Sequence, residues 1–87
     1  MKMTQRQIGI AKAILDTMHD WDGGQGHEIT IHADANLLFR TTIPKNEFDE
    51  VFKELNAQGC FIGIETKFKG TLWSLTPVGE KVRHEMQ

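Results

Sequence analysis

Residues 45–75 decide the fold, and they read KNEFDEVFKELNAQGCFIGIETKFKGTLWSL. In the first half, apolar side chains recur at steps of three and four, which predicts an amphipathic helix over residues 45–58. These apolar positions are Phe48, Val51, Phe52 and Leu55. Gly59 stands where a residue in the left-handed conformation commonly ends a helix. The segment therefore predicts a helix with a defined end.

The second half of this segment predicts a β-hairpin. β-branched and apolar residues fill positions 60–66, and apolar and polar residues alternate over positions 71–75. Lys67-Phe68-Lys69-Gly70 separates the two runs and predicts a four-residue loop. Thr76 and Pro77 then provide an N-cap and a first-position proline, so we expect a last helix to follow.

The N-terminal part predicts a helix from about residue 5 to residue 21, because its apolar residues share one face. Thr4 and Gln7 stand three apart, which is the spacing of a capping box. Three of the five residues at positions 22–26 are glycine. Glycine loses more backbone entropy in a helix than any other residue, so we expect the helix to end there.

The segment that follows predicts two short elements. Ile29 and Ile31 alternate with polar residues, which favours a strand over residues 28–32. Residues 34–40 predict a short helix that Asp34 caps. The predicted order is helix, strand, helix, helix, hairpin and helix, in a single domain that spans residues 1–87.

Two of these stretches resemble a known family. Residues 48–62 are similar to the third helix of a winged-helix domain where it enters the first wing strand. Residues 73–80, WSLTPVGE, resemble the close of the wing in bacterial regulators of the multiple-antibiotic-resistance and PadR types, and the layout is also similar to small prophage YjcQ-like proteins. The resemblance implies an α+β winged-helix fold: a three-helix core, a short strand plus a β-hairpin wing, and a C-terminal helix.

Composition and charge narrow the classes of function. The chain has 87 residues with 10 basic and 12 acidic side chains, a formal net charge of −2. This balance argues against a polybasic nucleic-acid binder. No apolar run approaches the roughly 18 residues that a membrane span needs, and no secretory signal opens the sequence. We therefore expect a cytoplasmic protein without a membrane partner.

The sequence gives little support for a catalytic, metal or cofactor site. Cys60 is the only cysteine, and no histidine stands near it as a base. The four histidines lack metal-ligand spacing. A calcium loop starting at Asp20 would need an acidic residue or Asn where Gly24 stands and Glu where Ile31 stands. No glycine-rich phosphate loop joins a strand to a helix. We expect no enzyme activity, no cofactor, no metal and no small-molecule ligand.

The resemblance implies that the helix over residues 45–58 reads DNA in a DNA-binding member. This helix carries two positive and four negative side chains, and carboxylates repel a polyanion. Its candidate DNA contacts are Lys45, Asn46 and Lys53, which Arg40 from the preceding segment can join. The alternative is a solvated face on which Asp49 and Lys53, four apart, form an ion pair.

The hairpin loop is the one concentrated basic feature. Residues 1–58 have a net charge of −3, and residues 59–87 a net charge of +1. Lys67 and Lys69 can contact phosphates while Phe68 wedges between bases or stacks on them. Alternatively, Phe68 anchors a protein partner, or it folds back over the hairpin and the lysines only solubilise the loop.

These features support two functions. The first is a small DNA-binding protein of the transcriptional-regulator type, which follows from the resemblance and from the basic loop. The second is a winged-helix module that binds a protein partner or forms a homodimer and does not bind DNA. The acidic helix favours the second function, because it would face the polyanion.

Overall fold

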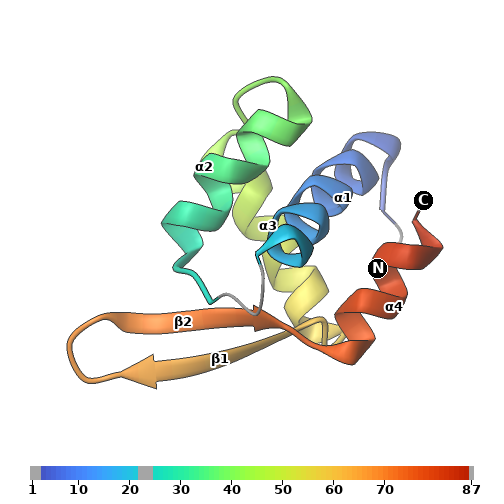
Figure 1. Ribbon diagram of the computed structural model, residues 1–87. Helices are drawn as coiled ribbons and strands as arrows, with labels where there is room; N and C mark the ends of the chain where they lie inside the picture. Colours follow the sequence, from blue (N-terminus) through green and yellow to red (C-terminus); the bar gives the residue numbers. More distant parts are fainter. Residues whose placement is uncertain (1–2, 22–24, 87) are drawn as a thin grey trace.

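The computed structural model describes residues 3–21 and 25–86. Within these residues the chain forms four helices and one antiparallel hairpin, an α+β arrangement with a winged-helix-like layout (Figure 1). In chain order the elements are α1 (Gln5–Asp20), α2 (Glu28–Phe39), α3 (Lys45–Ala57), β1 (Phe61–Thr66), β2 (Gly70–Leu75) and α4 (Pro77–Glu85). The predicted fold class is confirmed.

The start of α1 is fixed by the predicted capping box. The Thr4 hydroxyl accepts a hydrogen bond from the Gln7 backbone N–H at 3.1 Å, and the Thr4 N–H donates to Gln7 Oε1 at 2.9 Å. Two amide donors that the first helical turn leaves without a partner are thereby satisfied. The helix ends at Asp20 with Trp21 as its C-cap. The predicted glycine stop falls partly on residues 22–24, which lie outside the described residues.

The predicted strand over residues 28–32 and the separate helix over residues 34–40 are wrong. Both stretches belong to α2, whose N-cap is His27 and not Asp34. Ile31 and Ala35 stand four apart and are both fully buried, and this contact with the core outweighs the local β-branched composition. Just before α2, Gly26 and Trp73 of β2 exchange backbone hydrogen bonds in an isolated β-bridge.

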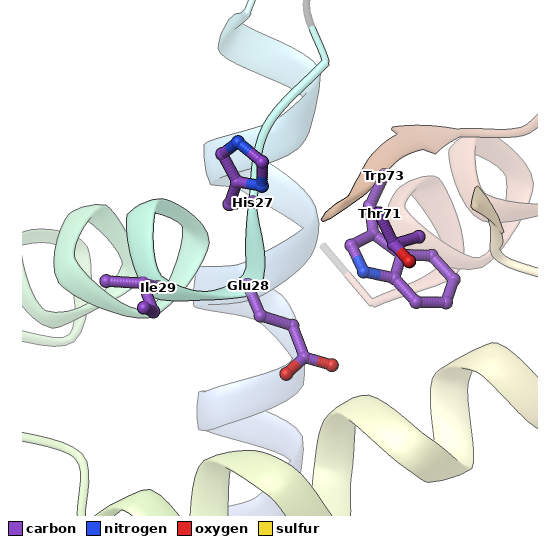
Figure 2. Close-up of a pocket in the computed structure, with 5 residues that line it drawn as sticks. All are labelled: His27, Glu28, Ile29, Thr71 and Trp73. Atoms are coloured by element: carbon purple, nitrogen blue, oxygen red, sulfur yellow. The ribbon is translucent and has the colours of Figure 1, made fainter. Parts of the chain in front are cut away.

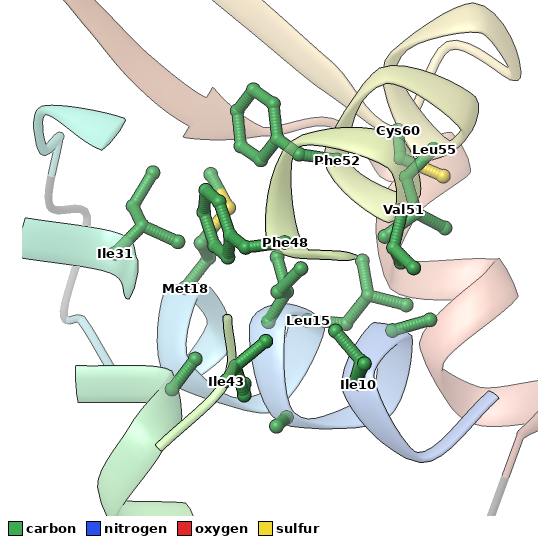
Figure 3. Packing of buried hydrophobic residues seen from close by; sticks show 14 of the residues in the cluster. Ile10, Leu15, Met18, Ile31, Ile43, Phe48, Val51, Phe52, Leu55 and Cys60 are labelled. Carbon is green, nitrogen blue, oxygen red and sulfur yellow. The ribbon is translucent and has the colours of Figure 1, made fainter. Parts of the chain in front are cut away.

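α1 and α3 supply most of the hydrophobic core (Figure 3). The buried residues of α3 are the four apolar positions of the predicted pattern, Phe48, Val51, Phe52 and Leu55. Phe52 stacks on Phe61 of β1 with 4.7 Å between ring centroids, which ties the helix to the hairpin. α3 ends at Ala57, and Gly59 has a φ of 85°, the predicted left-handed stop.

The hairpin projects from the core as the wing (Figure 1). Its pairing runs from Phe61 with Leu75 to Thr66 with Gly70. The loop holds residues 67–69 and is one residue shorter than predicted, because Gly70, with a φ of 70°, already belongs to β2. Trp73 lies over Gly63, where a Cβ atom would collide with the indole ring.

The stretch after β2 fixes the direction in which the wing leaves the core. The Thr76 hydroxyl donates to the Gly59 carbonyl at 2.6 Å and accepts from the Gly79 N–H at 3.1 Å. A Cβ atom at Gly79 would overlap the carbonyl oxygen of Cys60, so only glycine allows this close approach. α4 then starts at Pro77, as predicted.

Candidate nucleic-acid interface

The loop at the free end of the wing is held in shape by its own hydrogen bonds. Thr66 Oγ1 accepts from the Lys69 N–H at 3.0 Å and donates to the Gly70 carbonyl at 2.8 Å. Lys67, Phe68 and Lys69, hereafter the wing tip, therefore lie on a closed turn. This turn lies at the free end of the projecting hairpin, away from the four helices (Figure 1).

Phe68 is the most exposed large apolar side chain of the described residues. It is 89% exposed, so the interpretation in which it folds back over the hairpin is wrong for this structure. The Lys67 ammonium nitrogen lies 5.5 Å from the Phe68 ring centroid. Neither lysine of the wing tip forms an ion pair within residues 3–21 and 25–86. The wing tip thus presents two uncompensated cations and one bare aromatic ring.

The charges of α3 are arranged differently. Lys45 Nζ lies 2.8 Å from Asp49 Oδ2, and this hydrogen bond raises the pKa of the lysine. The ion pair expected between Asp49 and Lys53 is therefore wrong, because Asp49 binds the lysine one turn earlier. Lys53 is exposed and forms no ion pair among the described side chains.

A second ion pair joins α3 to α1. Arg6 donates to both carboxylate oxygens of Glu47, at 2.7 and 3.0 Å. The hydrogen bond from the guanidinium, followed by its charge, lowers the pKa of Glu47. Arg6, a cation of α1 that could face a polyanion, is thus engaged within the fold.

The remaining candidates do not gather at the wing tip. Arg40 is the exposed C-cap of α2, with a φ of 68°. It lies on the α2–α3 connection, which is at the end of the molecule opposite the hairpin, with Lys45 and Asn46 starting α3 just beyond it (Figure 1). The predicted contacts therefore form two separate groups, with Lys53 between them on α3.

A furrow separates the start of α2 from β2 and α3. His27 and Glu28 lie across from Thr71 and Trp73, around a hollow of about 370 Å³ (Figure 2). A second hollow, of about 250 Å³, continues it along Lys53 and neighbouring residues of α3. Two carboxylates, Glu28 and Asp49, and two lysines, Lys45 and Lys53, line the furrow, so its charge is mixed. No local sequence signal predicts this furrow, because its residues come from α2, β2 and α3, which only folding brings together.

Other titratable residues have structural partners. Cys60 is buried, and burial raises the pKa of its thiol, so it is not an activated nucleophile. His32 stacks on Phe48 with 4.4 Å between centroids, and His19 Nδ1 lies 2.8 Å from Glu80. Among the residues that the structure describes, no group of three or more His, Cys, Asp or Glu is placed to hold a metal ion.

Comparisons with known proteins add no relative. No family model, no curated protein and no solved structure matches this chain. In the described part of the chain no helix is both long and apolar enough to span a bilayer. Any function must therefore be argued from the geometry of the molecule itself.

Proposed function

We propose that this protein is a small winged-helix DNA-binding module of the transcriptional-regulator type, and that it contacts DNA first through its wing tip. The observation that carries the proposal is the 89% exposure of Phe68 between two lysines that form no ion pair within the described residues. An exposed phenylalanine contributes nothing to the core. Against a nucleic acid it can stack on a base or wedge into a base step, while lysines bind the flanking phosphates.

The charge of α3 supports a contact led by the wing. With two lysines against four carboxylates, and with Lys45 held by Asp49, this helix releases few counterions from DNA. Arg40, Asn46 and Lys53 are exposed and serve as secondary contacts. Phosphate contacts position a protein without reading sequence, so we expect low sequence specificity.

A salt titration tests this function. Binding to a random duplex is measured by fluorescence anisotropy at several salt concentrations, for the wild type and for Lys67→Ala/Lys69→Ala. Each lost phosphate contact lowers the log–log slope by about 0.9, so the double variant should lose about 1.8 of it. Lys12→Ala/Lys81→Ala, which removes the same charge from exposed positions on α1 and α4, is the matched control and should lose much less.

Two results would contradict the proposal: no binding of the wild type at the lowest salt, or an equal loss in both double variants. The first would favour the second candidate, a module that binds a protein and not DNA. Ile62 and Ile64 support that candidate, since both are exposed at alternate positions on the face of β1 opposite Phe61. Within the described residues β1 pairs only with β2, so its other edge can accept a strand from a partner.

A further inference from the structure

A hollow between the end of α1 and α2 has features that the fold does not use. It has a volume of about 190 Å³ and is lined by Thr17, Asp20, Trp21, Asp34, Leu37 and Leu38. Its apolar lining, hereafter its floor, consists of Trp21, Leu37 and Leu38, and Leu37 is 77% exposed. Removing an exposed leucine side chain from water is favourable, so this floor gains from an apolar occupant.

The charged lining of the hollow, hereafter its rim, consists of Asp20 and Asp34. Neither is in an ion pair within residues 3–21 and 25–86. Asp20 is the last residue of α1, where a negative charge opposes the helix dipole, so its charge does not help the helix. The rim therefore favours an occupant that carries cations beside its apolar side chain.

A third group in the hollow also lacks a partner. Thr17 is 3% exposed, and its Oγ1 makes no hydrogen bond within the described structure. Leaving a buried hydroxyl without a partner is unfavourable. An N–H donor entering the hollow can satisfy it. The hollow thus suits a segment that combines an apolar side chain with lysine or arginine.

The wing tip of the same chain has this chemistry. Phe68 matches the apolar floor, and Lys67 and Lys69 match the two rim carboxylates. We propose that two copies of this protein dock reciprocally, with the wing tip of each copy in the hollow of the other. A two-fold arrangement uses both tips and both hollows at once and closes the assembly as a dimer.

This self-association does not depend on the proposed DNA binding, although both use the wing tip and so exclude each other. The contact joins two small patches, and we expect a weak dimer with a dissociation constant in the micromolar to millimolar range. Phe68 is its aromatic anchor. Opposite charges at tip and rim set the register of the two copies.

Two charge-reversal variants test the docking by sedimentation velocity between about 10 μM and 1 mM. The tip variant is Lys67→Glu/Lys69→Glu, and the hollow variant is Asp20→Lys/Asp34→Lys. Each variant alone should self-associate at least about tenfold more weakly than the wild type. Their equimolar mixture should regain the dimer, because the acidic tip then meets a basic rim and the basic tip an acidic rim. Lys12→Glu/Lys81→Glu is the matched control and should associate as the wild type does.

Circular dichroism checks that each variant is folded before it is mixed, and a regained dimer confirms this, since unfolded chains cannot restore a dimer. A wild type that stays monomeric up to about 1 mM, or a mixture that does not regain association, would overturn the proposal. The hollow variant keeps an intact wing tip and should still bind duplex DNA. Loss of association with retained DNA binding therefore separates this proposal from the proposed function.

Discussion

α3 and the wing tip carry the same residue types in opposite situations. Phe48 of α3 is 1% exposed, whereas Phe68 of the wing tip is 89% exposed. Lys45 of α3 is held by Asp49 at 2.8 Å, whereas Lys67 and Lys69 form no ion pair within the described residues. Residue type alone therefore does not locate an interface. Burial and ion pairing, which only folding fixes, distinguish the two regions.

The net charge of the whole chain hides this difference between α3 and the wing tip. A formal charge of −2 for the whole chain suggests little affinity for a polyanion. Folding pairs Arg6 of α1 and Lys45 of α3 with carboxylates, and it leaves Lys67 and Lys69 without an ion pair among the described residues. A polyanion therefore meets a local basic site on an acidic molecule, and this predicts contact with few phosphates and weak binding.

The two phenylalanines offer the strongest contrast. Phe48→Ala should lower the free energy of unfolding by about 3–5 kcal/mol, because it leaves a cavity in the core. Phe68→Ala should change it by less than about 0.5 kcal/mol, since the ring is exposed. Urea denaturation followed by circular dichroism measures both. Comparable losses in the two variants would mean that the wing tip packs on the fold.

Phe68→Ala should show its effect in DNA binding. We expect duplex affinity to fall about tenfold, the effect of losing one stacking or wedging aromatic side chain. The duplex affinity of Phe68→Leu should lie between those of the wild type and Phe68→Ala, because leucine can wedge between bases but cannot stack on them. Anisotropy titrations at one salt concentration measure all three proteins, and equal affinities would exclude a role for the ring.

Asp49→Asn tests the comparison between α3 and the wing tip by changing the charge of α3. It removes one carboxylate from α3 and frees Lys45. We expect duplex affinity to rise about two- to fivefold and the salt slope to steepen. Glu85→Gln, which neutralises an exposed carboxylate at the end of α4, is the control for net charge. A gain of the same size in the control would assign the effect to total charge and not to α3.

The smallest effect concerns the ion pair between Arg6 and Glu47. The hydrogen bond from Arg6 lowers the pKa of Glu47 below its ordinary value of 4.5. The pair therefore stabilises the fold at pH values above 4.5, and this contribution is lost as the pH falls through the lowered pKa. Glu47→Gln should lower the free energy of unfolding slightly at pH 7 and by a smaller amount at pH 3. A loss of equal size at both pH values would show that the carboxylate charge is not involved.

The sequence predicted the elements whose signals are local. The Thr4 capping box, the stop at Gly59 and the cap at Thr76 each depend on residues within one turn, and the structure confirms all three. The strand over residues 28–32 failed for the opposite reason. Its β-branched residues favour a strand locally, but Ile31 and Ala35 are buried by packing of α2 against the core, which no local signal contains.

The candidate sites divide in the same way. The wing tip was visible in the sequence, because a turn with two lysines and a phenylalanine has little core to bury them. Lys45 and Lys53 each stand four residues from Asp49, so spacing alone does not decide which lysine it pairs with. Side-chain geometry does, and Asp49 pairs with Lys45. The hollow between α1 and α2 could not be seen, because its residues come from two helices that only folding brings together.

The central claim is that the wing tip, and not α3, makes the first contact with DNA. Titration of a ¹⁵N-labelled protein with a short duplex, followed by NMR, tests it most directly. The account predicts that the largest amide shift changes fall on residues 66–70, with smaller changes over α3. Largest changes over residues 45–57, with the hairpin loop unaffected, would contradict it.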